Sequence, residues 1–75
     1  MTRLPLVSGE EAVRAFGKAG WEAKRRESTH ITLKKRGTVR ILTVPAYKEL
    51  DAWILRKLIR DAGLTVQQFR ELLTD

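Results

Sequence analysis

The chain contains no cysteine and only one histidine, His30, among its 75 residues. Without cysteine the fold has no disulfide, no thiolate nucleophile and no sulfur ligand for a metal ion. A single histidine does not supply the usual ligands of a zinc site. We therefore expect neither a metal nor another cofactor, and a chain suited to a reducing compartment.

Long apolar runs are also missing. No stretch approaches the roughly 20 residues that a membrane span requires, and the N-terminal residues lack the apolar core of a signal peptide. We expect a cytoplasmic protein without a membrane partner. The short chain has no repeat, low-complexity tract or linker, so residues 1–75 are predicted to form one domain.

Positive charge, in contrast, is plentiful and concentrated in one segment. Residues 21–48 carry eight Lys or Arg and two Glu, which gives +6, and the rest of the chain is balanced. Such clustering favours a nucleic-acid partner, although exposed cations on strands also serve solubility or block edge pairing. The candidate RNA-binding residues are Lys24, Arg26, Lys34, Lys35, Arg36, Arg40 and Lys48.

The N-terminal part has the pattern of an amphipathic helix over about 9–19. Ser8 and Glu11 have the spacing of a capping box, and Gly20 is placed to end the helix. The apolar residues expected to face inward are Ala12, Val13, Phe16 and Ala19.

Two further helices are predicted near the C-terminus. One runs over about 51–62, from a possible Asp51 cap to a stop at Gly63. Thr65 and Gln68 form a second possible capping box, which opens a short final helix. The residues expected to be mostly inward are Trp53, Ile54, Leu55, Leu58, Ile59, Ala62, Phe69, Leu72 and Leu73. Both tryptophans are therefore expected in the core.

Between the helices the apolar period changes to two. Strands are predicted over 21–26, 30–35 and 38–44, with turns at 27–29 and 36–37. The order is α-β-β-β-α-α. This order predicts an α+β domain in which helices pack on one face of a three-stranded antiparallel sheet.

Side chains alternate between the two faces of a strand. If Ile31 and Leu33 face the helices, His30, Thr32 and Lys34 share the opposite face.

The neighbouring strands are placed by the same argument. Trp21 and Ala23 are expected to be inward, which sends Lys24 and Arg26 to the face of His30. The third strand is apolar on both sides, with Val39 and Ile41 on one side and Leu42 and Val44 on the other. Its second patch could be covered by a loop or could be a contact surface.

His30 is the candidate catalytic residue. A lone histidine is more often a surface or packing residue, but here hydroxyl groups of Ser28 and Thr29 precede it. The ordinary pKa of histidine, about 6.5, suits general acid–base chemistry. Cleavage of RNA without a metal needs a base for the 2′-hydroxyl, cations for the phosphate and a proton for the leaving oxygen.

The other parts of such a site are less narrowly defined by the sequence. Lys34, Arg26 or Arg40 could hold the phosphate, and water, a lysine or Tyr47 could supply the proton. Two alternatives remain open. One is an RNA-binding module without catalysis. The other is a DNA-binding helix-turn-helix, whose pattern covers 54–69, although its reading helix over 65–73 contains only one basic residue, Arg70.

Several segments in order resemble the HicA toxins, the mRNA interferases of type II toxin–antitoxin systems. They are Ser8-Gly9, Ala19-Gly20-Trp21, the run from Arg25 to His30, Thr43-Val44-Pro45, Lys48-Glu49-Leu50 and the run from Leu55 to Leu64. In this family a Gly-Ser pair usually stands where this chain has Ser28-Thr29. Tyr47 stands where members often carry a second histidine.

The resemblance implies a double-stranded-RNA-binding-domain-like αβββα fold with a short extra C-terminal helix. It implies mRNA as the substrate, His30 as the catalytic residue, and a site supported by Ser28, Thr29 and Tyr47. The implied protein partner is a HicB-like antitoxin that masks the active site. DNA would be reached only indirectly, through the antitoxin complex.

Overall fold

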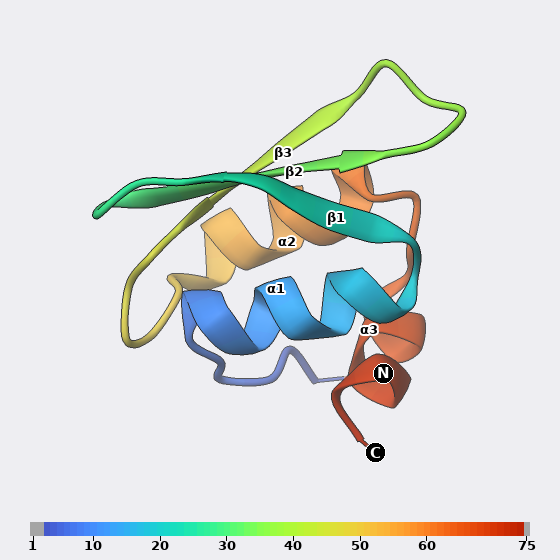
Figure 1. Ribbon diagram of the computed structural model, residues 1–75. Helices are drawn as coiled ribbons and strands as arrows, with labels where there is room; N and C mark the ends of the chain where they lie inside the picture. Colours follow the sequence, from blue (N-terminus) through green and yellow to red (C-terminus); the bar gives the residue numbers. More distant parts are fainter. Residues whose placement is uncertain (1–2, 75) are drawn as a thin grey trace.

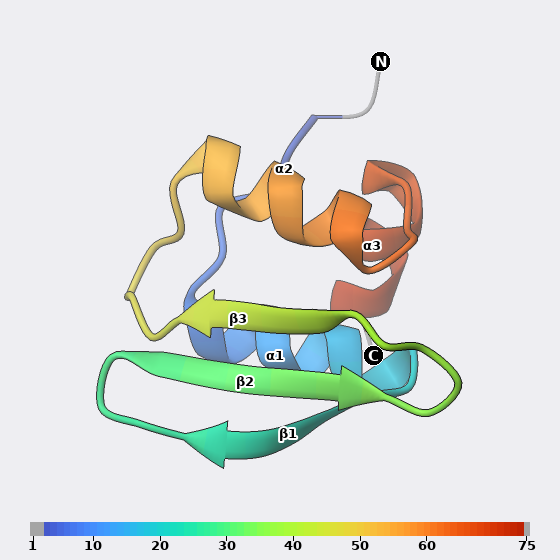
Figure 2. The same ribbon diagram turned by 90° about the horizontal axis from the view of Figure 1, so that it is seen from above.

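The computed structural model describes residues 3–74, which form three helices and three strands (Figure 1). They are α1 (Gly9–Lys18), β1 (Trp21–Arg26), β2 (His30–Lys35), β3 (Ile41–Pro45), α2 (Ala52–Asp61) and α3 (Val66–Leu73). The strands form one antiparallel sheet in the order β1-β2-β3 (Figure 2). The predicted α+β class and αβββα order are confirmed, and α3 is the short additional helix.

The helix ends follow the local signals of the sequence. The Ser8 hydroxyl accepts a hydrogen bond from Glu11 N at 3.0 Å, and the Glu11 carboxylate accepts one from Ser8 N at 2.8 Å. Thr65 and Gln68 form the same reciprocal box at α3. Asp51 occupies the N-cap position of α2 but makes no capping hydrogen bond through its side chain. No helix within residues 3–74 is long and apolar enough to cross a membrane.

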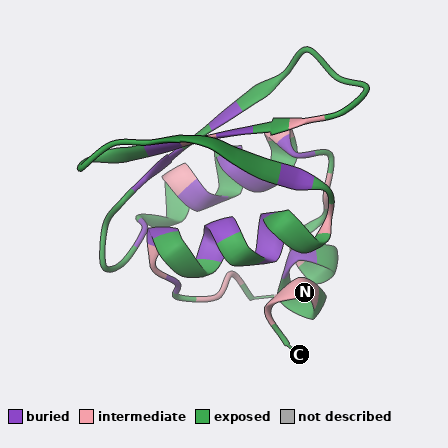
Figure 3. Ribbon diagram, in the orientation of Figure 1, coloured by how far each residue is buried: buried purple, intermediate pink, exposed green. Residues whose placement is uncertain are grey.

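The core lies between the sheet and the helices, where the buried segments face one another (Figure 3). Leu33 of β2, Val44 of β3 and Leu55 of α2 are fully buried there. Phe16 of α1 and Phe69 of α3 meet with their ring centroids 5.1 Å apart. Because α3 contributes this buried ring, the C-terminal helix is part of the core.

Trp53 is the clearest departure from the predicted core. Its side chain is 68% exposed, whereas Trp21 is 4% exposed, so only Trp21 is a core tryptophan. Each residue turns an α-helix by about 100°, so Trp53 points roughly 200° away from Leu55. Leu55 is buried with Leu58 and Ile59 on the core side of α2, and Trp53 in the first turn therefore points away from the core.

The third strand begins three residues later than predicted. Thr38 Oγ1 accepts a hydrogen bond from Arg40 N at 3.1 Å, a local bond that competes with the strand ladder. Leu42 and Val44 face the helices. Ile41 is 50% exposed, and Val39, in the β2–β3 connection, is fully exposed, so no loop within residues 3–74 covers this second apolar patch.

Candidate active site

His30 is the first residue of β2. The helices of residues 3–74 lie on one side of the sheet and leave its other face uncovered (Figure 1). Ile31 and Leu33 are buried toward the helices, while His30 and Lys34 are exposed on the opposite face, which we call the outer face. Thr32 lies between them and is half-buried. The predicted outward position of His30 is confirmed.

The turn before β2 holds the backbone of His30 in place. His30 O accepts a hydrogen bond from Glu27 N at 2.9 Å, and Thr29 O accepts one from Ala46 N at 2.9 Å. His30 also pairs with Pro45 in the ladder between β2 and β3. The backbone around His30 is therefore held by the turn before β2 and by the end of β3, although the His30 side chain is exposed.

Thr29 contacts the imidazole ring. Its Oγ1 lies 2.8 Å from His30 Nδ1. If the proton is on Nδ1, it is donated to Thr29 Oγ1, and Nε2 is left with a free electron pair that can accept a proton. The opposite tautomer would carry its proton on Nε2 and could not act as a base there. The Thr29 hydroxyl fits both tautomers, because it accepts from a protonated Nδ1 and donates to an unprotonated one; the first arrangement is the one that a general base requires.

The other two residues predicted to support the site, Ser28 and Tyr47, precede Thr29 and follow β3 respectively. Within residues 3–74, neither Ser28 nor Tyr47 makes a side-chain hydrogen bond to His30. Ser28 is exposed in the turn before β2, and Tyr47 is half-exposed in the loop after β3. The carbonyl oxygen of Tyr47 accepts a hydrogen bond from Gly9 N at 2.9 Å. A Cβ at position 9 would collide with the carbonyl of Pro45, so glycine allows this close contact with α1.

A β-bulge in β1 changes which arginine lies on the outer face. The register shifts between Ala23 and Arg25, so that Arg25 pairs with Thr32. Arg26 then pairs with Ile31, which faces the helices.

Arg26 therefore lies on the helix side of the sheet. Its Nη1 is 3.0 Å from Glu10 Oε2 of α1. The expectation that Arg26 shares the face of His30 is wrong, because the bulge reverses the alternation after Ala23. Ala23 itself pairs with the buried Leu33 but is exposed. Trp21 is the one buried residue of β1, which is an edge strand of the sheet.

The outer face of β1 and β2 carries a shallow cationic depression. It is lined by Lys24, Arg25, Thr32 and Lys34. Lys24 Nζ is 3.0 Å from Glu22 Oε1, an ion pair with both side chains more than half exposed. Arg25 is not among the predicted RNA-binding residues, because a bulge within a mostly polar strand leaves no break in apolar alternation.

The remaining candidate cations do not line this depression. Lys35 is half-buried, and its aliphatic chain passes beside Gly20. Arg36 is exposed in the turn after β2, at the opposite end of that strand from His30. Lys48 is exposed in the loop before α2. The structure thus spreads the candidate RNA-binding residues over the sheet and its connections.

Arg40 belongs to a small ion-pair network on α2. Its Nη1 is 3.4 Å from Asp61 Oδ1, and Lys57 Nζ is 2.8 Å from Asp61 Oδ2. The hydrogen bond from Lys57 lowers the pKa of the Asp61 carboxyl, and the charges of Arg40 and Arg60 act in the same direction. This network joins α2 to the connection before β3.

A groove of about 290 Å³ runs over the free edge of β3, between the outer face and α2. We call it the β3–α2 groove. Its strand side includes His30, Ile41 and Thr43, and its helix side includes Trp53 and Lys57. In Figure 2, β3 lies between β2 and α2, which places the groove at the edge of the sheet.

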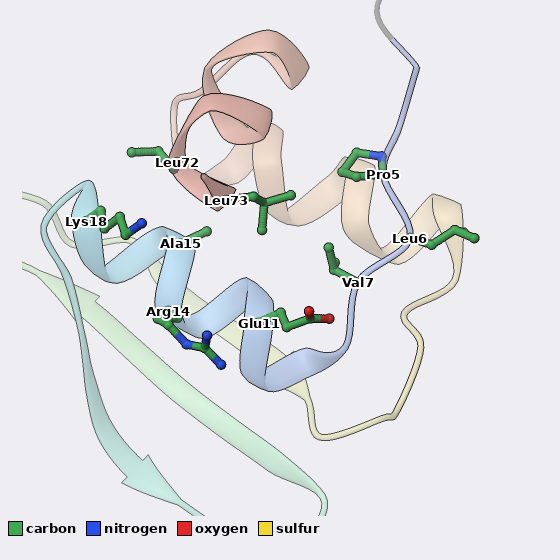
Figure 4. Close-up of a pocket in the computed structure, with 9 residues that line it drawn as sticks. All are labelled: Pro5, Leu6, Val7, Glu11, Arg14, Ala15, Lys18, Leu72 and Leu73. Atoms are coloured by element: carbon green, nitrogen blue, oxygen red, sulfur yellow. The ribbon is translucent and has the colours of Figure 1, made fainter. Parts of the chain in front are cut away.

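A second cavity, of about 200 Å³, lies in the helix layer (Figure 4). The N-terminal segment, α1 and α3 form its walls, and its charged residues are Glu11, Arg14 and Lys18. Glu11 is already engaged in the capping box of α1. His30 does not line this cavity.

The second helix of the possible helix-turn-helix, α3, packs against the rest of the domain. Phe69 of α3 is fully buried. Arg70, the basic residue of this helix, donates a hydrogen bond to Arg3 O at 2.8 Å. These contacts give α3 a packing role, and they occupy the side chain that would have to contact DNA.

The family model described as "HicA toxin of bacterial toxin-antitoxin" matches residues 9–64 of the 75. The chain belongs to the HicA toxin family. As a HicA-family member it is a toxin of a toxin–antitoxin system, with an antitoxin as its partner. The match covers α1, the sheet with His30, and α2, and it ends before α3. A search of curated proteins finds no match to the chain.

Proposed function

We propose that this HicA-family toxin is an endoribonuclease that cleaves mRNA without a metal ion, with His30 as the general base. The observation that carries the proposal is the 2.8 Å contact between Thr29 Oγ1 and His30 Nδ1 on an exposed face. Lys24, Arg25 and Lys34 lie on the same face, and a polyanion is the ligand that such a surface attracts.

RNA carries its own nucleophile, the 2′-hydroxyl beside the scissile phosphate. In the proposed reaction, His30 Nε2 removes the 2′-hydroxyl proton, and the oxygen attacks phosphorus. The bond from phosphorus to the 5′-oxygen breaks, and the products are a 2′,3′-cyclic phosphate and a 5′-hydroxyl. The leaving oxygen takes its proton from water, a protonated lysine or Tyr47.

The cationic depression would neutralise the phosphate. Lys34 shares the outer face of β2 with His30, and Arg25 and Lys24 border it from β1. Such donors stabilise the negative charge that grows on the phosphate oxygens as the 2′-oxygen attacks. Arg36 and Arg40 lie farther along the sheet and would contact the RNA backbone away from the cleaved bond.

We also propose RNA and a HicB-like antitoxin as the partners. Because the outer face is basic and exposed, an acidic antitoxin surface placed over His30 would exclude RNA from it. DNA would then be contacted through the antitoxin and not through α3, since Arg70 is bound to Arg3.

Substitution of His30 tests the proposed function. We expect His30→Ala to slow cleavage of a labelled transcript by roughly 10²–10⁴-fold in EDTA-containing buffer, and to abolish growth inhibition. Circular dichroism should stay unchanged, because His30 is exposed. Arg14→Ala, an exposed change in α1, is the control and should cleave at the wild-type rate.

Wild-type cleavage by His30→Ala would refute the mechanism. Binding of RNA by the wild-type protein without any cleavage would favour the non-catalytic RNA-binding module instead.

A further inference from the structure

Trp53 is exposed without a structural reason for a tryptophan at this position. Its side chain is 68% exposed in the first turn of α2, whose buried residues are Leu55, Leu58 and Ile59. A large aromatic side chain left in water forgoes the free energy that its burial would contribute. The core contacts of α2 therefore do not depend on Trp53.

The same groove contains both Trp53 and His30. Thr43 and Ile41 of the edge strand β3 also line it, on the outer face. Pro45 is the β3 residue paired with His30, whereas Ile41 is paired with Lys34, so the 50% exposed Ile41 adds apolar surface farther along the same groove.

A nucleotide suits this groove better than a purely apolar ligand. The phosphate that the proposed function places at His30 is anionic, and a base attached to the same nucleotide has flat apolar faces and a polar rim. Indole is an effective stacking partner for any base, and Thr43 adds a hydroxyl to the strand wall. Lys57 on the helix wall adds positive charge, although its Nζ is bound to Asp61 at 2.8 Å.

We propose that the β3–α2 groove is a nucleobase subsite, in which Trp53 stacks on an unpaired base next to the phosphate held at His30. The inference rests on the proposed function, because it takes RNA as the substrate. It adds a selectivity: a base inside a duplex is stacked on its neighbours and cannot lie on Trp53, so the toxin binds single-stranded RNA in preference to duplex RNA.

The two tryptophans allow a direct measurement of binding. Trp21 is 4% exposed and Trp53 is 68% exposed, so a bound base should quench mainly the fluorescence of Trp53. The probe is a single-stranded 2′-O-methyl oligoribonucleotide, which lacks the attacking hydroxyl and cannot be cleaved. We expect the wild-type signal to fall on titration, and the signal of Trp53→Phe, which retains only Trp21, to stay nearly constant.

Affinity and kinetics provide the second readout. We expect Trp53→Ala to bind the oligonucleotide roughly tenfold more weakly and to raise KM by a similar factor for a cleavable single strand. Trp53→Phe should recover most of the lost affinity, because phenylalanine also stacks. Leu6→Ala is the control: Leu6 is 78% exposed in the N-terminal segment, and its replacement should not affect affinity.

Several outcomes would overturn the subsite. One is an unchanged affinity and KM in Trp53→Ala, with cleavage otherwise normal. Another is a loss of antitoxin binding in Trp53→Ala without any loss of RNA affinity, which would make the groove a protein-docking site. If the wild-type protein neither binds nor cleaves RNA, the proposed function fails and the subsite fails with it.

Discussion

The two faces of β2 differ although their residues alternate along one short strand. Ile31 and Leu33 are 1% and 0% exposed on the helix side. His30 and Lys34 are exposed on the outer face and make no contribution to the core. Alternation thus assigns stability to one face and leaves the other free to carry chemistry, so neighbouring substitutions should have different consequences.

The largest effect is expected from Leu33→Ala. Removing this fully buried side chain should lower the free energy of unfolding by about 2–5 kcal/mol, a large share of the stability of a small domain. Its neighbour, Lys34→Ala, should change stability by less than about 0.5 kcal/mol. Urea denaturation measures both. Equal losses of stability would show that the two faces are not separate.

Lys34→Ala should instead act on RNA. We expect weaker binding and a salt dependence of affinity whose slope is smaller by about one.

Thr29→Val should show how much the contact with Thr29 contributes to catalysis while the imidazole of His30 is still present. The valine keeps the shape but removes the Oγ1 that lies 2.8 Å from His30 Nδ1. We expect kcat for RNA cleavage to fall roughly tenfold, which corresponds to about 1.4 kcal/mol, with no change in thermal stability. Thr29→Ser keeps the hydroxyl and should retain most of the activity. A serine variant as slow as the valine variant would contradict an orienting role.

The bulge in β1 leads to a third contrast, between Arg25 and Arg26. Arg25 lies on the outer face, so Arg25→Ala should weaken RNA binding several-fold and reduce its salt dependence. Arg26 is paired with Glu10 of α1, so Arg26→Ala should affect RNA less and lower stability by less than about 1 kcal/mol. Binding titrations at two salt concentrations distinguish the two arginines, and a stronger effect from Arg26 would contradict the bulge.

A small effect on stability is also expected at Asp61, away from both faces of β2. Its pKa is lowered in the folded protein by the hydrogen bond from Lys57 and by the nearby charges of Arg40 and Arg60. The carboxylate therefore stabilises the fold above the ordinary aspartate pKa of about 4, and this contribution is lost as pH falls through the lowered value.

Asp61→Asn should accordingly cost less than about 1 kcal/mol at pH 7, and the difference from the wild type should shrink at about pH 3. Denaturation at the two pH values measures this. A difference that grows in acid would contradict the sign of the pKa shift.

Local chemistry explains why most elements were predictable. The capping boxes at Ser8 and Thr65 involve residues three apart, so they are visible in the sequence. The positions of His30 and Lys34 were also predictable, because Ile31 and Leu33 leave one phase for β2. In β1 the residues after Trp21 are mostly polar and show no alternation of apolar and polar side chains. The bulge that places Arg26 on the helix side of the sheet was therefore not visible in the sequence.

The sequence by itself determined the order of helices and strands, the concentration of charge in residues 21–48, and the outward position of His30. Each depends on near neighbours along the chain, where spacing and residue type act directly. Only the tertiary structure decided that Arg25 replaces Arg26 on the outer face, and that Trp53 lies in one groove with His30. Those relations depend on strand register and on where α2 packs against β3, which arise from contacts between residues distant in the chain.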